Sequence, residues 1–280
     1  MCQTLNNYPS YQFSIFRLYT GIYLLIIFIS AIPSAAATWS NEGLVPKASS
    51  NLTYGVFPNI LNHFDSPQEI KLFLIVHAAF AMCYTIGFGR RWAGFFLWYG
   101  WTCLFNRNNL TLNPSIPYIG WLLLASCFVP TGEPWSIDKK DDNWQMPKPI
   151  LNGAWILLIL GYFFSGVDKL HSISWANGTA IKKIMECHLG LGWNEWLLDK
   201  FPQQFFVLVN WIAIGLELAC LPLALFWRTR RLAWIFTLLV QVGISFILDI
   251  YPIVFGMLTI LIFTFPASKA KENLFSPVRL

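Results

Sequence analysis

The sequence predicts an all-α fold: a polytopic integral membrane protein built as a bundle of about eight transmembrane helices. Hydrophobic residues make up 56% of the 280 residues and charged residues only 12%, whereas a soluble domain carries about 25% charged residues. The apolar residues also gather into long runs, and a membrane-spanning helix needs about 20 predominantly apolar residues. Most of the surface of such a chain must therefore face lipid.

The first apolar run is interpreted as a retained helix over residues 13–32. It is longer than the apolar core of a signal peptide, which has about 7–15 residues behind a basic start. Arg17 lies inside the run, and no basic residue precedes it. We therefore expect a transmembrane helix at this position and no cleaved leader.

Seven further spans follow from the same apolar pattern. The span 93–104 is short for a crossing, so the number of spans falls below eight if this run is re-entrant or merges with a neighbour. The seven spans are expected at 70–88, 93–104, 116–129, 150–167, 205–226, 232–248 and 253–265.

The distribution of Lys and Arg predicts the orientation, because cytoplasmic loops carry an excess of these residues. With the N-terminus in the cytoplasm, eleven of these cations fall on the cytoplasmic side and six on the outer side. We therefore expect both termini in the cytoplasm. The eleven are Arg90, Arg91, Lys139, Lys140, Lys148, Arg228, Arg230, Arg231, Lys269, Lys271 and Arg279. The six are Lys47, Arg107, Lys169, Lys182, Lys183 and Lys200.

Two segments on the expected outer side, about 33–69 and 171–202, are long enough to form structure of their own. In the second, Thr179 is a plausible N-cap, and the apolar side chains that follow it, beginning with Ile181, fall on one helix face. We expect short interfacial helices there, lying on the outer membrane face. Three N-x-[S/T] sequons lie on the same side and agree with this orientation: Asn51, Asn109 and Asn177.

The sequence gives no sign of nucleic-acid or metal binding. The net charge of +5 arises from cations between apolar spans, and no basic stripe with interleaved aromatic residues is present. The six cysteines show no C-x-x-C spacing, which argues against a disulfide framework and a zinc site. His171, Glu186 and His188 share one segment but lack the spacing of a metal motif. We expect neither a metal nor a nucleic-acid partner.

Three ionisable residues lie inside apolar spans, and each has a structural and a functional interpretation. Arg17 is either a snorkelling arginine, a member of a buried ion pair with Glu217 as a candidate partner, or a ligand for an anionic headgroup. His77 is either a hydrogen-bonded core residue or a ligand-binding residue. Glu217 is either structurally paired or protonated, or it takes part in ligand binding or a proton relay.

Lys169 lies at the end of the span 150–167, directly after Asp168. These two side chains do not pair easily, because adjacent helix positions do not face each other. Lys169 shares a helix face with Ser165 and Gly166, which leaves room for a ligand or another helix. It is either a lysine that snorkels to the interface or a general base brought toward neutrality by desolvation.

The run that contains this lysine, GYFFSGVDKLHSISWANGTAI, resembles the Gly-x-x-Lys-Leu…Trp-x-x-Gly segment of the HTTM (horizontally transferred transmembrane) family. That family includes the membrane part of vitamin K-dependent γ-carboxylase. The resemblance continues, and covers most of the chain in order, with FRLYTGIYLL in the first span, HAAFAMCYTIGFGRR in the second, NRNNLTLNPSIPYIGWLLLA before the fourth and PWSID at 134–138.

The resemblance implies a single HTTM-type domain over residues 1–280 in a bacterial cytoplasmic membrane, with Lys169 as its catalytic residue. In the animal carboxylase, the matching lysine is the base that vitamin K hydroquinone oxidation activates, and the active site opens toward the lumen. A quinol or another isoprenoid-like lipid is therefore the expected cofactor, held near the outer face. We expect Asn113, Ser165 and Glu217 to shape the site, with Arg17 and His77 as further candidates for binding substrate or membrane lipid.

The departures from the carboxylase narrow the expected chemistry. Pro114 follows Asn113 where the carboxylase has a histidine, and Asp168 stands where the animal enzyme has a basic residue. The chain ends at Leu280, so we expect no β-rich soluble portion and no peptide glutamate carboxylation. A carboxylase-like lyase or another quinol-dependent enzyme acting at Lys169 is the leading interpretation.

A second interpretation comes from a different functional class. The chain would then be a non-enzymatic membrane partner for export, maturation or immunity of a small secreted peptide, which docks on the segment 171–202. A transporter is less favoured, because the sequence shows no inverted repeat or paired broken helices.

Overall fold

The computed structural model describes residues 8–138, 140–226 and 228–266. Within these ranges every regular element is a helix, apart from an isolated bridge between Gly190 and Leu248, and the all-α prediction is confirmed. Four of the eleven cations used to predict the orientation, as well as one cysteine, lie outside the described residues: Lys139, Lys269, Lys271, Arg279 and Cys2.

The chain divides into two compact units, which are described separately. The α1 unit contains Ser10–Ile150 and Phe255–Phe263. Among the described residues, the α10 unit contains Leu151–Val254 together with residues 8–9 and 264–266. The α1 unit holds α1 (Ser10–Ala31), α3 (Pro67–Ile86), α4 (Arg90–Arg107), α5 (Ser115–Ser126) and most of α12 (Tyr251–Phe263).

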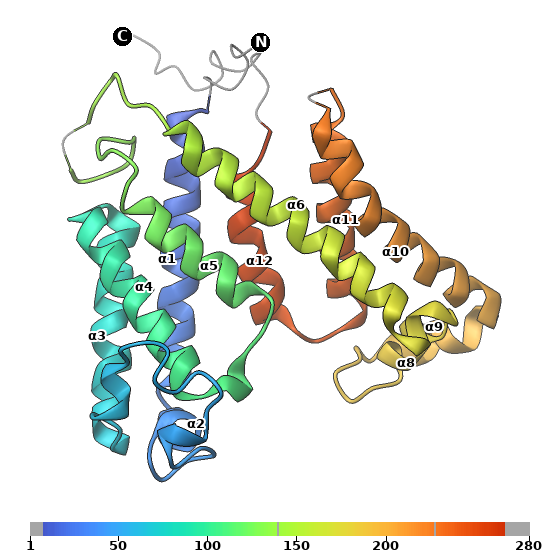
Figure 1. Cartoon of the computed structure of the whole chain (residues 1–280), viewed down its shortest axis with the longest axis horizontal. Coiled ribbons are helices and arrows are strands. Elements are labelled where there is room, and N and C mark those ends of the chain that lie inside the picture. The colour runs from blue at the N-terminus through green and yellow to red at the C-terminus, as the bar shows by residue number, and fades with distance from the viewer. Residues whose placement is uncertain (1–7, 139, 227, 267–280) are drawn as a thin grey trace. The chain divides into compact units, whose positions relative to one another are not determined.

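In the α1 unit, α3 packs against α1, α4 against α3 and α5 against α4 (Figure 1). Helix α3 begins with a capping box between Ser66 and Glu69 and ends at Gly87, whose left-handed φ of 79° favours glycine. Gly21 lets α1 approach α3 closely, since a Cβ atom there would lie 2.2 Å from Thr85 Oγ1. These signals explain where α3 starts and stops and why the two helices meet.

The segment between α1 and α3 contains α2 (Ala35–Trp39) and two short 3-10 helices, Ala48–Ser50 and Ile60–Asn62. It is fastened to the end of α4 by side chains that bind backbone carbonyls. Asn51 Nδ2 donates to the Arg107 carbonyl (2.8 Å), and Asn51 Oδ1 accepts from the Asn109 amide (3.0 Å). Two of the three sequon asparagines therefore have structural roles, whereas Asn177 is exposed.

The α10 unit contains most of α6 (Lys148–His171) and the hairpin of α10 (Gln203–Leu225) and α11 (Arg230–Ile247). Three short helices gather near the end of α6 and the start of α10 (Figure 1): α7 (Ile173–Ala176), α8 (Ala180–Met185) and α9 (Asn194–Lys200). Short helices are thus present within 171–202. Thr179 does precede α8, but its hydroxyl donates to the Ser174 carbonyl (3.2 Å) and does not cap the helix.

Five helices are long and apolar enough to cross a membrane: α1, α3, α6, α10 and α11. Helices α5 and α12 are apolar but have only 12 and 13 residues, and at 1.5 Å per residue they are shorter than the hydrocarbon core of about 30 Å. The span predicted at 93–104 becomes α4, which starts earlier, at Arg90, and ends at Arg107. The number of about eight spans is not confirmed and stays a prediction.

Candidate functional site

Lys169 lies in the last turn of α6, where α6 meets α10. Its Nζ atom donates to both carboxylate oxygens of Glu217, at 2.7 and 2.6 Å, and to Ser165 Oγ at 2.8 Å. The Glu217 side chain is only 2% exposed and that of Lys169 is 18% exposed. All three N–H donors of the ammonium group are therefore bound, two of them by a buried carboxylate.

Local sequence explains why this pair forms. Ser165 and Lys169 are four positions apart, so they share one face of α6. On the same face, Gly166 opposes α10: a Cβ atom there would lie 3.1 Å from Glu217 Cβ and 3.1 Å from Leu218 Cγ. The missing side chain lets α10 come close enough for its carboxylate to reach the ammonium group.

Trp175, on α7, covers the ammonium group from a third direction. Lys169 Nζ lies 5.1 Å from the centre of the indole ring, within the range of a cation–π contact. Asn210 on α10 holds α7 in place by donating to the Trp175 carbonyl (2.9 Å). Gly178 has a left-handed φ of 72°, and a Cβ atom there would lie 2.8 Å from Val207 Cγ1. In the Trp-x-x-Gly motif, Trp175 thus supplies the ring that covers Lys169, and Gly178 allows the turn that packs against α10.

The Lys169–Glu217 pair is neutral as a whole, and its immediate environment is mostly uncharged. Asp168 is exposed on the adjacent helix position, and the exposed His171 bonds to the Val167 carbonyl through Nδ1 (2.9 Å). Cys220 lies one turn after Glu217 and bonds to the Leu216 carbonyl (3.2 Å). A buried ion pair of this kind is costly to desolvate, which makes it a candidate functional site.

Arg17 belongs to a different cluster, within the α1 unit. It is fully buried, and its Nε atom lies 3.1 Å from Glu133 Oε1, which also lies 3.0 Å from Arg90 Nε. Arg17 further donates to the Trp135 carbonyl (2.7 Å) and to the carbonyls of Tyr84 and Thr85. The buried ion pair considered for Arg17 exists, but its partner is Glu133, and Glu217 pairs with Lys169.

His77 and Asn113 also lie in the α1 unit, in structural environments. His77 Nδ1 bonds to the Phe73 carbonyl (2.7 Å), and the imidazole fills the space beside Gly100, where a Cβ atom would lie 2.0 Å from it. Asn113 Oδ1 accepts from the amide (3.0 Å) and the hydroxyl (2.6 Å) of Ser115 at the start of α5. Of the six predicted site residues, the structure brings together Lys169, Ser165 and Glu217.

Glu133 and Trp175 were not among the predicted site residues. No helical periodicity marks Glu133, which stands in a loop just before the PWSID run. Trp175 carried a signal, the Trp-x-x-Gly spacing, but that spacing alone does not show that the indole covers Lys169. Within the described ranges, no three His, Cys, Asp or Glu side chains are placed to hold a metal ion.

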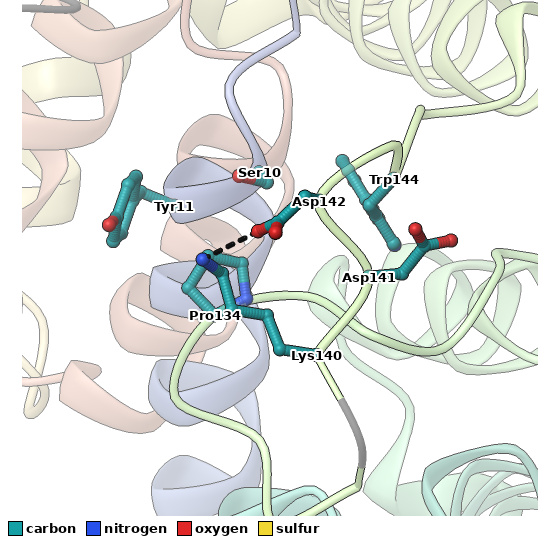
Figure 2. A pocket seen from close by; sticks show the side chains of 7 residues that line it. All are labelled: Ser10, Tyr11, Pro134, Lys140, Asp141, Asp142 and Trp144. Atoms are coloured by element: carbon teal, nitrogen blue, oxygen red, sulfur yellow. Dashed lines mark ion pairs between the residues drawn. The ribbon is translucent and has the colours of Figure 1, made fainter.

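A polar recess lies elsewhere in the α1 unit, where the loop after α5 passes the start of α1 (Figure 2). Its lining residues are Ser10, Tyr11, Pro134, Lys140, Asp141, Asp142 and Trp144. Lys140 Nζ lies 2.7 Å from Asp142 Oδ1, and both side chains are exposed. This hydrogen bond raises the pKa of Lys140 and lowers the pKa of Asp142. An exposed pair of this kind contributes little to stability and does not define a site.

Comparison with protein families identifies the family of this chain. The model of the HTTM domain matches residues 8–268, which is nearly the whole chain. The chain therefore belongs to the HTTM domain family, as its motifs indicated, and is an integral membrane protein. Searches of the curated proteins and of the solved structures found no match.

Proposed function

From its place in the HTTM family and the geometry around Lys169, we propose that this protein binds a quinol or another isoprenoid-like lipid beside the Lys169–Glu217 pair. Lys169 acts there as a general base. The observation that carries the proposal is a buried ion pair between two apolar helices. Ionisable groups at such positions are costly and are a functional-site hypothesis by default.

The residues around the pair fit such a ligand. The carboxylate of Glu217 can accept from a phenolic hydroxyl as well as from Lys169, and Trp175 offers a flat aromatic face. A quinol, when bound, supplies reducing equivalents and an ionisable hydroxyl group. Ser165 and Glu217 orient the lysine, so that the chain contributes position and proton transfer, as a protein does around a redox cofactor.

The proposal extends to location and orientation. We place the protein in a bacterial cytoplasmic membrane with both termini in the cytoplasm and with Lys169 near the outer face, surrounded by membrane lipids. The excess of Lys and Arg in the expected cytoplasmic loops supports this arrangement, and so does the lumenal active site of the carboxylase that the chain resembles.

The test compares lysine variants in the inserted protein. With dissolved oxygen supplied as the oxidant, we expect Lys169→Ala and Lys169→Arg to lower the rate of quinol oxidation by about 10²–10⁴-fold, because a positioned base contributes that much and arginine is not deprotonated. Lys183→Ala, which removes an exposed lysine of the same unit, is the control and retains turnover. Unchanged turnover in both Lys169 variants removes the catalytic role.

A second candidate function is a non-enzymatic partner of a small secreted peptide. It is favoured by apolar side chains that stand exposed on the segment 171–202: Ile173, Trp193 and Trp196. Mass spectrometry of the gently purified protein separates the two candidates. A co-purifying quinone favours the first function, and a bound peptide favours the second.

A further inference from the structure

We propose that Glu217 is the proton acceptor that converts Lys169 from an ammonium ion into an amine when an apolar ligand binds beside the pair. This inference rests on the proposed function, because it presumes a ligand at this site. It assigns to Glu217 a proton transfer, which a purely structural ion pair with Lys169 does not require.

Lys169 must lose a proton before it can act as a base, and its contacts show which group can take that proton. An ammonium group that donates three hydrogen bonds, here to Ser165 and to both oxygens of Glu217, has no free electron pair and cannot accept a proton. Some neighbouring group must first remove one. The Glu217 oxygens, 2.7 and 2.6 Å from Nζ, are in place to do so, whereas the neutral hydroxyl of Ser165 is too weak a base.

Ser165 lies beside the pair, because its Oγ atom accepts from the same Nζ atom of Lys169 that donates to Glu217. Nearby titratable groups of the adjoining elements are exposed or bonded elsewhere. Asp168 and His171 are exposed on α6, Cys220 bonds to backbone on α10, and Lys182 on α8 pairs with Glu186 at 3.9 Å. The charged group that contacts Lys169 Nζ and can accept its proton is therefore Glu217.

The transfer balances without an oxidant. One N–H bond of Lys169 breaks, its electron pair stays on Nζ, and an O–H bond forms on Glu217, so that the total charge of the pair stays zero. The indole face of Trp175 favours the ionic form, and the side chain of Lys169 keeps an exposed fraction of 18%. A ligand that covers this exposed part of Lys169 with hydrocarbon favours the neutral form, because burial in an apolar environment costs charged groups more than neutral ones.

The experiment is infrared difference spectroscopy on the full chain in phospholipid nanodiscs, with phylloquinol kept reduced as the probe. Addition of phylloquinol should produce the carbonyl band of a protonated carboxylic acid. The band should be absent in Glu217→Gln and present in the control Glu195→Gln, which changes an exposed glutamate of the same unit. A merely structural role of Glu217 does not produce this band.

The rate of quinol oxidation, measured with dissolved oxygen as the oxidant, gives a second readout. We expect Glu217→Gln to lower it by about 10²-fold, the lower range for a lost proton-transfer group, and Glu217→Asp to restore part of it, because a carboxylate is again present. Binding of phylloquinol without the band, or with the band retained in Glu217→Gln, overturns the inference and leaves the proposed function intact. If phylloquinol does not bind to the wild-type protein, the inference fails together with the quinol form of the proposed function.

Discussion

Glu133 pairs with two arginines that come from different helices, Arg17 on α1 and Arg90 on α4. The guanidinium groups also bind carbonyls where helices end. Arg17 reaches Tyr84 near the end of α3, and Arg90 donates to the Ser126 carbonyl (2.5 Å) at the end of α5. Helix C-termini carry partial negative charge. The backbone carbonyls therefore offset the net positive charge of the cluster. Arg17 has a structural role in joining α1 to the end of α3 and to Glu133.

This cluster makes Glu133→Gln a strongly destabilising substitution. Two buried arginines would lose their counter-charge, and breaking a buried pair costs about 3–5 kcal/mol. The measurement is the free energy of unfolding in mixed micelles. Glu195→Gln, at an exposed site, should stay close to the wild type. Equal stability of the two variants would show that Arg17 and Arg90 do not depend on Glu133.

Single residues also show how far sequence reasoning reaches. Spacing alone placed Ser165, Gly166 and Lys169 on one face of α6, because residues three and four apart on a helix are neighbours. It did not identify Glu217 as the partner of Lys169. That contact joins residues 48 positions apart, and it depends on how α6 and α10 pack. Likewise, the pairing of Arg17 with the loop residue Glu133 follows from tertiary structure only.

Among the elements, the contact between α6 and α10 depends on the absence of a side chain at Gly166. We expect Gly166→Ala to destabilise the protein by about 1–3 kcal/mol, as overpacking does, and to weaken the Lys169–Glu217 contact. A Cβ atom at Gly215 on α10 has no neighbour within 4 Å. Gly215→Ala is therefore the matched control, with an expected gain of about 0.5–1 kcal/mol from helix propensity.

Unfolding experiments on both variants check this expectation, together with the affinity for phylloquinol. If Gly166→Ala is as stable as Gly215→Ala and binds phylloquinol as the wild type does, then close approach of α10 is not what holds the pair together. A loss of affinity in Gly166→Ala alone would tie binding to the helix contact.

The long helices were predicted better than the start of α4 and the position of α7. The long apolar helices were found from hydropathy, since each carries a nearly continuous apolar run. Helix α4 begins at Arg90, outside the apolar run 93–104, and the guanidinium group of this arginine is buried against carbonyls at and just after the end of α5. Hydropathy treats an arginine as a boundary and cannot detect a buried one. The short helices of 171–202 were expected, but the position of α7 over Lys169 depends on Asn210 and Gly178.

For the molecule as a whole, the sequence predicted the class of protein better than the number of crossings. An apolar composition and ordered family motifs are spread over the chain, and the HTTM match spans residues 8–268. The number of crossings depends on helix length, and α5 and α12 are too short to reach across about 30 Å of hydrocarbon as straight helices. Counting apolar runs therefore does not count crossings.

Orientation is the property of the whole molecule on which the placement of Lys169 rests, and Cys187 provides a direct test. This thiol is exposed in the turn after α8, within the segment 171–202 that follows Lys169. If both termini are cytoplasmic, a membrane-impermeant maleimide should label Cys187 in intact cells. Cys187→Ser should lose that label, because the thiol itself is removed. Labelling of Cys187 only in inside-out vesicles would place Lys169 near the cytoplasmic face and reverse the proposed topology.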